Sequence, residues 1–414
     1  MMSDRDMAND RDMISDLELT TGRWLADHEQ LMRNIRPLPD LSGLRTPCYV
    51  LDEQKLDDNL KLLRAVAEAA DCRILLAQKA FSMFSVYPLV RQYLNGAAAS
   101  GLHEALLGHE MFGKETHTFS PAFTMDEFDD ILAASDHVIF NSFSQWAIFR
   151  EKALKSGKSF GMRINPEHPT QDPEHALYDP CSPGSRLGVT AAEFRPDLLE
   201  GLSGLHFHCL CEQNADALEE TLAAVEAKFG QWLPRMKWVN FGGGHHITRP
   251  DYDVDRLIRL VRQFRERYDV AVYLEPGEAI ALDAGYLVTR VVDVVQNKLP
   301  IAILDTSTTC HMPDVLEMPY RPRIFGAGLP DERAVTVRLG GPSCLAGDVT
   351  GDYSFDRMPA PGDRLVFQDM AIYTMVKNTT FNGIRLPDIV NWHRDGSLEV
   401  VRSFGYDDFK NRLS

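Results

Sequence analysis

The stretch CRILLAQKAF, residues 72–81, decides the fold because it places a lysine directly after a short apolar run. The apolar residues 74–77 have the length of one buried strand, and Lys79 falls where that strand would emerge from a parallel sheet. A lysine in this place either extends its ammonium to solvent or loses its charge through pairing or covalent chemistry. The rest of the chain has to decide between these two interpretations.

The segments on both sides of this run repeat a strand pattern followed by a helix pattern. Upstream, TPCYVLD (46–52) alternates like a strand, and residues 53–70 carry their apolar side chains on one helical face. The strand patterns that follow lie at 137–141, 159–166, 204–210, 237–244 and 271–278, and the helix patterns between them lie at 144–157, 215–230 and 253–268. Such repeats over about 230 residues predict a (β/α)8 barrel.

After residue 286 the rhythm changes to short apolar runs separated by turn residues, which predicts an all-β domain of about 120 residues. We therefore divide the chain into an N-terminal extension (1–45), a barrel (46–285) and a C-terminal β domain (286–414). The extension has few large apolar side chains before a helical pattern at 22–35, so we expect it to be loosely attached.

Composition restricts the class of protein. The chain has 414 residues, of which 44% are hydrophobic, and a formal net charge of −17. This charge disfavours binding to nucleic acid or to anionic membranes, and it is compatible with a small cationic substrate. No apolar run has the length of a membrane span, and the first residues are charged, so we predict a cytoplasmic protein. Seven scattered cysteines predict free thiols and not a disulfide framework.

Polar residues follow several of the predicted strands, where a barrel enzyme carries its active site. They are Lys79, Arg163, His206, His208, the glycines Gly242, Gly243 and Gly244, and Glu275. A glycine run lets main-chain amides approach a phosphate, and a carboxylate can keep a pyridine nitrogen protonated. Together with a lysine that must lose its charge, these residues predict a site for pyridoxal 5'-phosphate.

A metal-dependent barrel hydrolase is the alternative from a different class of enzyme. His206 and His208, with Cys209 and Cys211, have ligand chemistry that suits zinc. On a strand, however, the two histidines share one face and the two cysteines share the other, so the four cannot converge. We therefore expect no metal at this stretch.

Seven stretches resemble carboxynorspermidine/carboxyspermidine decarboxylase, a family of alanine racemase-like (fold type III) pyridoxal phosphate enzymes. They are LAQKAF (76–81), GLHFHCLCEQ (204–213), NFGGGHHITRPDYD (240–253), YLEPGE (273–278), CHMPDVLEMPYRP (310–322), GGPSCLAGDVTGDYSFD (340–356) and FQDMAIYTMVKNTTFNG (367–383). The likeness runs from about residue 46 to the C-terminus. It implies a barrel followed by a β domain, in agreement with the pattern of the residues.

The resemblance also implies roles for individual residues. Lys79 would hold the cofactor covalently, His208 would lie against its ring, and Glu275 would pair with its pyridine nitrogen. The three glycines would receive its phosphate with help from the Tyr373 hydroxyl, and Arg163 joins the cofactor-binding group. Cys344 corresponds to a catalytic cysteine that reaches the site from a partner subunit, so the resemblance implies a homodimer with active sites at the subunit interface.

The sequence departs from the ornithine decarboxylase branch of this superfamily at two places. Glu278 stands where that branch has an arginine that contacts phosphate, and Leu345 follows the cysteine where that branch has an aspartate. A carboxylate at 278 suits a substrate ammonium. The substrate-binding residues that we predict are Glu278, Asp314, Asp305, Asp348 and His245.

The resemblance implies decarboxylation of carboxynorspermidine or carboxyspermidine to norspermidine or spermidine, a step of polyamine biosynthesis. Alternatives within this chemistry are carboxyaminopropylagmatine, lysine or diaminopimelate as substrate. A metal-dependent hydrolase using His206 and His208 and a non-catalytic pyridoxal phosphate carrier are the alternatives of another class. The second domain bearing Cys344 disfavours a simple carrier.

Overall fold

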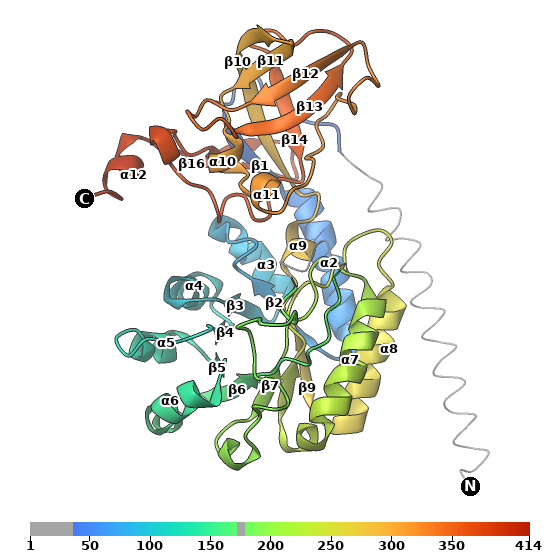
Figure 1. Cartoon of the computed structure of the whole chain (residues 1–414), viewed down its shortest axis with the longest axis vertical. Helices are drawn as coiled ribbons and strands as arrows, with labels where there is room; N and C mark the ends of the chain where they lie inside the picture. The colour runs from blue at the N-terminus through green and yellow to red at the C-terminus, as the bar shows by residue number, and fades with distance from the viewer. Residues whose placement is uncertain (1–35, 172–178) are drawn as a thin grey trace, which may run out of the picture.

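The computed structural model describes residues 36–171 and 179–414, which form a barrel and a second, mostly β domain (Figure 1). The predicted architecture is therefore confirmed. The helical pattern at 22–35 lies outside the described residues. Within the described ranges, no helix is both long and apolar enough to cross a membrane.

The barrel consists of eight parallel strands that pair in sequence order, with the last strand closing onto the first. The strands are β2 (Arg73–Ala77), β3 (Gly96–Ala99), β4 (Glu115–Phe119), β5 (His137–Phe140), β6 (Ser159–Arg163), β7 (Gly204–His206), β8 (Trp238–Asn240) and β9 (Ala271–Leu274). Their carboxyl ends all face the same rim of the barrel, because a closed parallel sheet aligns its strands. The predicted strand-end residues are therefore gathered at one rim.

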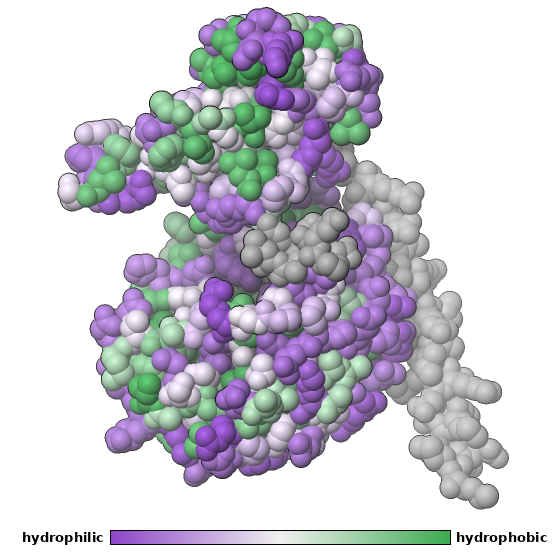
Figure 2. All heavy atoms as spheres, in the orientation of Figure 1, coloured by the Kyte–Doolittle hydropathy of each residue, from purple (hydrophilic) through white to green (hydrophobic). Residues whose placement is uncertain are grey.

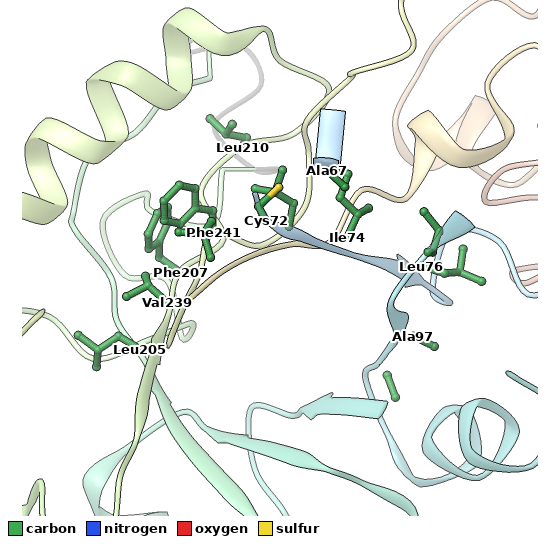
Figure 3. Close-up of a cluster of buried hydrophobic side chains, with 14 of the residues drawn as sticks. Ala67, Cys72, Ile74, Leu76, Ala97, Leu205, Phe207, Leu210, Val239 and Phe241 are labelled. Carbon is green, nitrogen blue, oxygen red and sulfur yellow. The ribbon is translucent and has the colours of Figure 1, made fainter. Parts of the chain in front are cut away.

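Helices surround the strands and bury the apolar face that the sequence pattern predicts. They are α2 (Glu53–Ala70), α3 (Tyr87–Tyr93), α4 (Leu102–Leu107), α5 (Phe128–Ala134), α6 (Phe143–Ser156), α7 (Ala215–Phe229), α8 (Val254–Tyr268) and the short α9 (Glu278–Ala281), with single turns η1 (Phe84–Val86), η2 (Gly108–Phe112), η4 (Pro196–Leu198) and η5 (Gly230–Arg235). Part of this core is shown in Figure 3, where Leu205, Phe207, Val239 and Phe241 of neighbouring strand segments lie together. Each fully buried side chain of this size stabilises the fold by roughly 1.5–3 kcal/mol.

The second domain is built on one eight-stranded sheet with the strand order β13-β12-β11-β10-β1-β15-β16, to which β14 adds by pairing with β10. Its strands are β1 (Cys48–Asp52), β10 (Gly285–Asn297), β11 (Leu299–Leu304), β12 (Val335–Gly340), β13 (Val349–Phe355), β14 (Arg364–Gln368), β15 (Asp388–Trp392) and β16 (Leu398–Arg402), and its short helices are α10 (Thr308–His311), α11 (Asp314–Glu317), η6 (Phe381–Gly383) and α12 (Tyr406–Lys410).

The expectation that residues 46–52 open the first barrel unit is wrong. The strand β1 pairs antiparallel with β10 and parallel with β15, so it belongs to the sheet of the second domain. All five of its residues are buried because that sheet is covered on both faces there. The chain then crosses at once into the barrel, since the Asp52 side chain caps α2 by accepting hydrogen bonds from the amides of Gln54 and Lys55. The domain limits 1–45, 46–285 and 286–414 stay a prediction.

Candidate active site

A cavity of about 410 Å³ opens at the carboxyl rim of the barrel, on the side of the second domain. Figure 2 shows the recess between the two domains, bordered by hydrophilic residues on the visible face. The predicted residues that line the cavity are Lys79, Arg163, His206, His208, Gly243, Gly244, Glu275, Glu278 and Tyr373. The barrel rim and a loop of the second domain thus bring together residues that are separated by almost 300 positions in sequence.

Lys79 lies two residues beyond the end of β2, and its side chain is exposed to the cavity. It forms no hydrogen bond or ion pair with any described residue. The side chain reaches the cavity because the strand ends at Ala77, two residues before the lysine. An accessible primary amine at the rim of a barrel is suited to covalent chemistry with a carbonyl group.

Glu275 follows β9 and is held by donors from two neighbouring strands. The Asn240 side-chain amide donates a hydrogen bond of 2.7 Å to Oε1, and His206 Nε2 lies 3.4 Å from Oε2. Burial alone would raise the pKa of Glu275, but the hydrogen bonds from His206 and Asn240 outweigh it and lower the pKa to about 2. Glu275 is therefore a permanently ionised carboxylate.

The hydrogen bonds also fix the orientation of both donors. Asn240 Oδ1 accepts a 2.8 Å hydrogen bond from the Gly242 amide, so its NH2 group must point to Glu275. Burial lowers the pKa of His206, and its Nδ1 has no partner, so the neutral ring carries its proton on the nitrogen that faces Glu275. Sequence reasoning assigned no role to Asn240, although it ends β8 and lies two residues before the glycine run.

His208 presents its ring to the cavity as a neutral imidazole. Its Nδ1 accepts a 2.7 Å hydrogen bond from the Gly243 amide, which places the ring proton on Nε2. Burial, followed by the charges of Lys79 and Arg163, lowers the pKa of His208 well below its ordinary value. Arg163 is almost fully buried and donates to the main-chain carbonyl of His208, so it supports the position of this histidine.

The glycine run forms a tight loop in which side chains have no room. Gly242 and Gly244 have φ angles of 72° and 80°, and a Cβ on Gly244 would lie 2.1 Å from the carbonyl oxygen of Leu210. The amides of Gly242 and Gly243 donate to Asn240 and His208, whereas the Gly244 amide has no acceptor among the described residues. Of the three amides predicted to receive a phosphate, the structure leaves Gly244 available at the cavity.

Tyr373 and Glu278 form the side of the cavity that faces the second domain. The Tyr373 amide donates to the Ala80 carbonyl at 2.9 Å, which fastens the loop after β14 to the loop that carries Lys79. Burial, followed by the charge of Glu278 and its hydrogen bond, raises the pKa of Tyr373 well above its ordinary value. The side chain of Glu278 is buried beside the cavity, as a residue that meets a substrate cation would be.

Glu212 is a candidate residue that sequence reasoning missed. Glu212 is exposed and does not line the cavity, yet partial loss of hydration and the charges of Glu278 and Asp369 raise its pKa to about 7. A single glutamate in a loop carries no distinguishing pattern in the sequence. Only the fold brings it near carboxylates that are more than sixty positions away.

Four of the predicted substrate-binding residues do not line the cavity. Asp305 accepts hydrogen bonds from Thr46, Thr289 and the Arg290 amide inside the second domain, and Asp348 accepts from Ser307, Thr309 and Ser343 there. Asp314 pairs with Lys377. His245 is fully buried behind the glycine loop, where burial lowers its pKa to about 4. In this chain the three aspartates bind donors or a lysine of the same chain, and the histidine packs behind the glycine loop.

Cys344 is exposed on the loop after β12 and does not line the cavity of its own chain. Its amide donates a 2.8 Å hydrogen bond to Asn382, which fixes the direction of the loop. The neighbouring side chains of Leu345 and Phe381 expose 45% and 46% of their surface. An exposed thiol between exposed apolar side chains is compatible with a contact to another protein surface.

The cavity fits pyridoxal phosphate on the evidence of its own residues. Lys79 supplies an unpaired amine, Glu275 supplies an ionised acceptor for a protonated ring nitrogen, and the side-chain-free loop at Gly244 supplies an amide for a phosphate oxygen. A barrel rim with these three groups, next to a β domain, defines a pyridoxal phosphate enzyme of fold type III. His206 and His208 turn to separate partners, Glu275 and Gly243, and do not form a shared metal site.

Comparisons with known proteins agree with this class. The family model described as "Pyridoxal-dependent decarboxylase, C-terminal sheet domain" matches residues 48–371, and the chain belongs to this pyridoxal-phosphate-dependent decarboxylase family. It is 45% identical to the carboxynorspermidine/carboxyspermidine decarboxylase of Campylobacter jejuni over 89% of this chain and 98% of that protein. It is 44% identical to the carboxyaminopropylagmatine decarboxylase of Synechocystis sp. over 92% of this chain and 98% of that protein.

A solved structure shows the same arrangement of domains. The crystal structure of carboxynorspermidine decarboxylase from Campylobacter jejuni, complexed with norspermidine, superposes with a TM-score of 0.83 at 44% identity, covering 89% of this chain and all of that chain. This agreement confirms the predicted family, fold and cofactor. The two curated relatives have different substrates at almost equal identity, so identity does not select the substrate.

Proposed function

We propose that this protein decarboxylates carboxynorspermidine and carboxyspermidine to norspermidine and spermidine. The observation that carries the proposal is the buried carboxylate of Glu278 on the cavity wall, with the exposed carboxylate of Glu212 near it. Such a wall suits a substrate with several ammonium groups, because each buried carboxylate requires a cation or donor as partner. The similarity to the Campylobacter jejuni enzyme over nearly its whole length supports the same conclusion.

Each residue of the site would have a separate role in decarboxylation. Pyridoxal phosphate, when bound, supplies an electron-accepting ring that stabilises the charge left on the α-carbon when carbon dioxide departs. Lys79 would hold the cofactor and yield its place to the substrate amine. Glu275 would hold the proton on the ring nitrogen, because its own pKa of about 2 leaves it unprotonated. His208 would cover one face of the ring, so that the substrate approaches the other face.

We propose that the working unit is a homodimer in the cytoplasm. The exposed Cys344, remote from the cavity of its own chain, would return a proton to the α-carbon in the site of a second copy. All seven cysteines are free thiols, as expected for a reducing compartment. Mixing Lys79→Ala and Cys344→Ala chains tests the dimer: each variant alone should be inactive, and the mixture should recover up to about a quarter of the wild-type rate. Recovery fails if the two residues serve the same chain.

The substrate is tested by steady-state kinetics on the cofactor-saturated enzyme. We expect the highest kcat/KM with carboxynorspermidine or carboxyspermidine, and a value at least tenfold lower with diaminopimelate or lysine. Carboxyaminopropylagmatine is the second candidate, because the Synechocystis sp. relative that is named for it is 44% identical to this chain. A higher kcat/KM with that compound would replace the proposed substrate and leave the proposed chemistry intact.

The cofactor attachment is tested without any turnover. The absorbance of the purified protein should show a near-visible band that borohydride removes, and peptide mass mapping should then locate the reduced pyridoxyl group on Lys79. A colourless protein that remains unmodified when pyridoxal phosphate is added would contradict the assignment.

A further inference from the structure

A second cluster of histidine and carboxylate side chains lies at the amino-terminal end of the barrel, opposite the cavity. Glu115 and His137 are the first residues of β4 and β5, and His117 is the middle residue of β4. Their side chains point into the barrel, because His117 and His137 contact Tyr273 and Trp238 of the strands on the far side. None of these residues lines the decarboxylase cavity.

The spacing of the three side chains fits a metal ion. One ligand atom from each of Glu115, His117 and His137 lies within 4.8 Å of the other two. His117 Nε2 is 3.3 Å from Glu115 Oε2, and the edge of a tetrahedral zinc site with bonds of about 2.1 Å is about 3.4 Å long. Within residues 36–171 and 179–414, no other group of three such side chains is this compact.

Neighbouring groups orient the carboxylate and leave one imidazole nitrogen unused on each ring. Arg73 donates a 2.8 Å hydrogen bond to Glu115 Oε1, and the Tyr273 hydroxyl donates to Oε2 at 3.1 Å. The buried Nδ1 atoms of His117 and His137 have no hydrogen-bond partner among the described residues. A third of the Glu115 side chain remains accessible, which provides an entry path from solvent.

We propose that Glu115, His117 and His137 bind one divalent transition-metal ion of the zinc type, with water completing the coordination. The site is structural: it fastens β4 to β5 at the end of the barrel that carries no catalytic residue. Arg73 competes with the ion, since its guanidinium already neutralises Glu115. Its side chain is half exposed and can turn toward solvent when the ion enters. The proposal is independent of the substrate of the decarboxylase.

The test is zinc binding by tag-free, cofactor-loaded enzyme after chelator treatment and dialysis, measured by calorimetry. We expect one equivalent bound to this cluster, a rise in the melting temperature on adding zinc, and at least tenfold weaker binding in His137→Gln. Arg73→Gln should bind zinc at least threefold more tightly, because the competing cation is gone. His168→Gln, which alters a surface histidine beside the single carboxylate of Glu220, is the matched control and should bind as wild type does.

Each outcome of these binding measurements either supports or overturns the proposed metal site. Absence of zinc binding in the wild type overturns the proposal, and so does equal affinity in wild type and Arg73→Gln, which would place the ion at another site such as an exposed thiol. If His137→Gln does not fold, Arg73→Gln still decides, since Arg73 lies at the solvent edge of the cluster and its loss leaves the three ligands in place.

Discussion

Exchanging Asn240 for aspartate changes one donor next to Glu275 into an acceptor and leaves the shape of the side chain unchanged. The Gly242 amide can still donate to the remaining oxygen, so the glycine loop keeps its support. The 2.7 Å hydrogen bond to Glu275 is lost and a second carboxylate faces the first. The variant therefore tests whether the ionised state of Glu275 matters for catalysis.

The expected rise in the pKa of Glu275 in the Asn240→Asp variant follows from two contributions. A lost hydrogen bond to a charged group is worth about 1.5–3 kcal/mol, and two like charges about 4 Å apart at an effective dielectric constant of 20 repel by about 4 kcal/mol. Together they correspond to roughly four pKa units at 1.36 kcal/mol each. The pKa of Glu275 is about 2 in the wild type, so in the Asn240→Asp variant Glu275 and the introduced carboxylate should together take up one proton near pH 6.

The measurement is the pH dependence of carbon dioxide release between pH 5 and 9 at saturating cofactor. Because the pKa of Glu275 is lowered, its contribution to stability is present above its ordinary pKa and is lost only as the pH falls toward 2. The wild type should therefore show no activity loss from Glu275 in this range. Asn240→Asp should lose activity as the pH falls through about 6, with at least a tenfold lower kcat at pH 5 than at pH 8.

The chain offers a matched control for this exchange. Asn391 of β15 is also buried and donates a 3.0 Å hydrogen bond to a glutamate, Glu53, far from the cavity. Asn391→Asp should lose stability like Asn240→Asp but keep the wild-type pH profile. Coincident profiles for Asn240→Asp and wild type would refute the reasoning, because they would mean that the charge of Glu275 does not limit the reaction.

Three further outcomes follow from the structure. Gly243→Ala would place a Cβ 2.4 Å from the carbonyl oxygen of Glu275, so cofactor binding to the apoenzyme should weaken at least tenfold in a fluorescence titration. The control Gly43→Ala, with no atom near its added Cβ, should bind the cofactor as the wild type does. Glu278→Gln should raise the KM for the proposed triamine by 10- to 100-fold with a smaller change in kcat, as expected from losing about 1.5–3 kcal/mol at a charged contact; an unchanged KM would remove Glu278 from the substrate site. Asp52→Ala removes the cap of α2 and should lower the free energy of unfolding by about 1–2 kcal/mol without changing kcat, as urea titration and activity would show.

The fold could be predicted because its main features are periodic. The helical face of residues 53–70 and the apolar run at 74–77 become α2 and β2 with bounds close to those expected. The partner of β1 could not be predicted, since a strand that is buried at every position satisfies either sheet equally well. Only the long strand β10, which pairs with β1, β14 and β11 in succession, shows why the second sheet receives it.

The chemically active residues could be predicted where they follow a strand, because strand ends of a parallel barrel meet at one rim. Lys79, His208 and Glu275 are of this kind. Asp305 and Asp348 could not be placed in this way, since their loops belong to the second domain and their oxygens meet donors of that domain. Carboxylates alone do not indicate which cation or amide they will meet.

The two ends of the cofactor site are joined by the side chain of Asn240. Its oxygen accepts from the Gly242 amide at the glycine loop, and its nitrogen donates to Glu275. An amide is the only ordinary side chain of this size that can do both, because one end accepts while the other donates. The position of the loop and the charge of the carboxylate are thus set together, and a shift of either should disturb the other. This coupling explains why a side chain that does not line the cavity is buried completely at the end of β8.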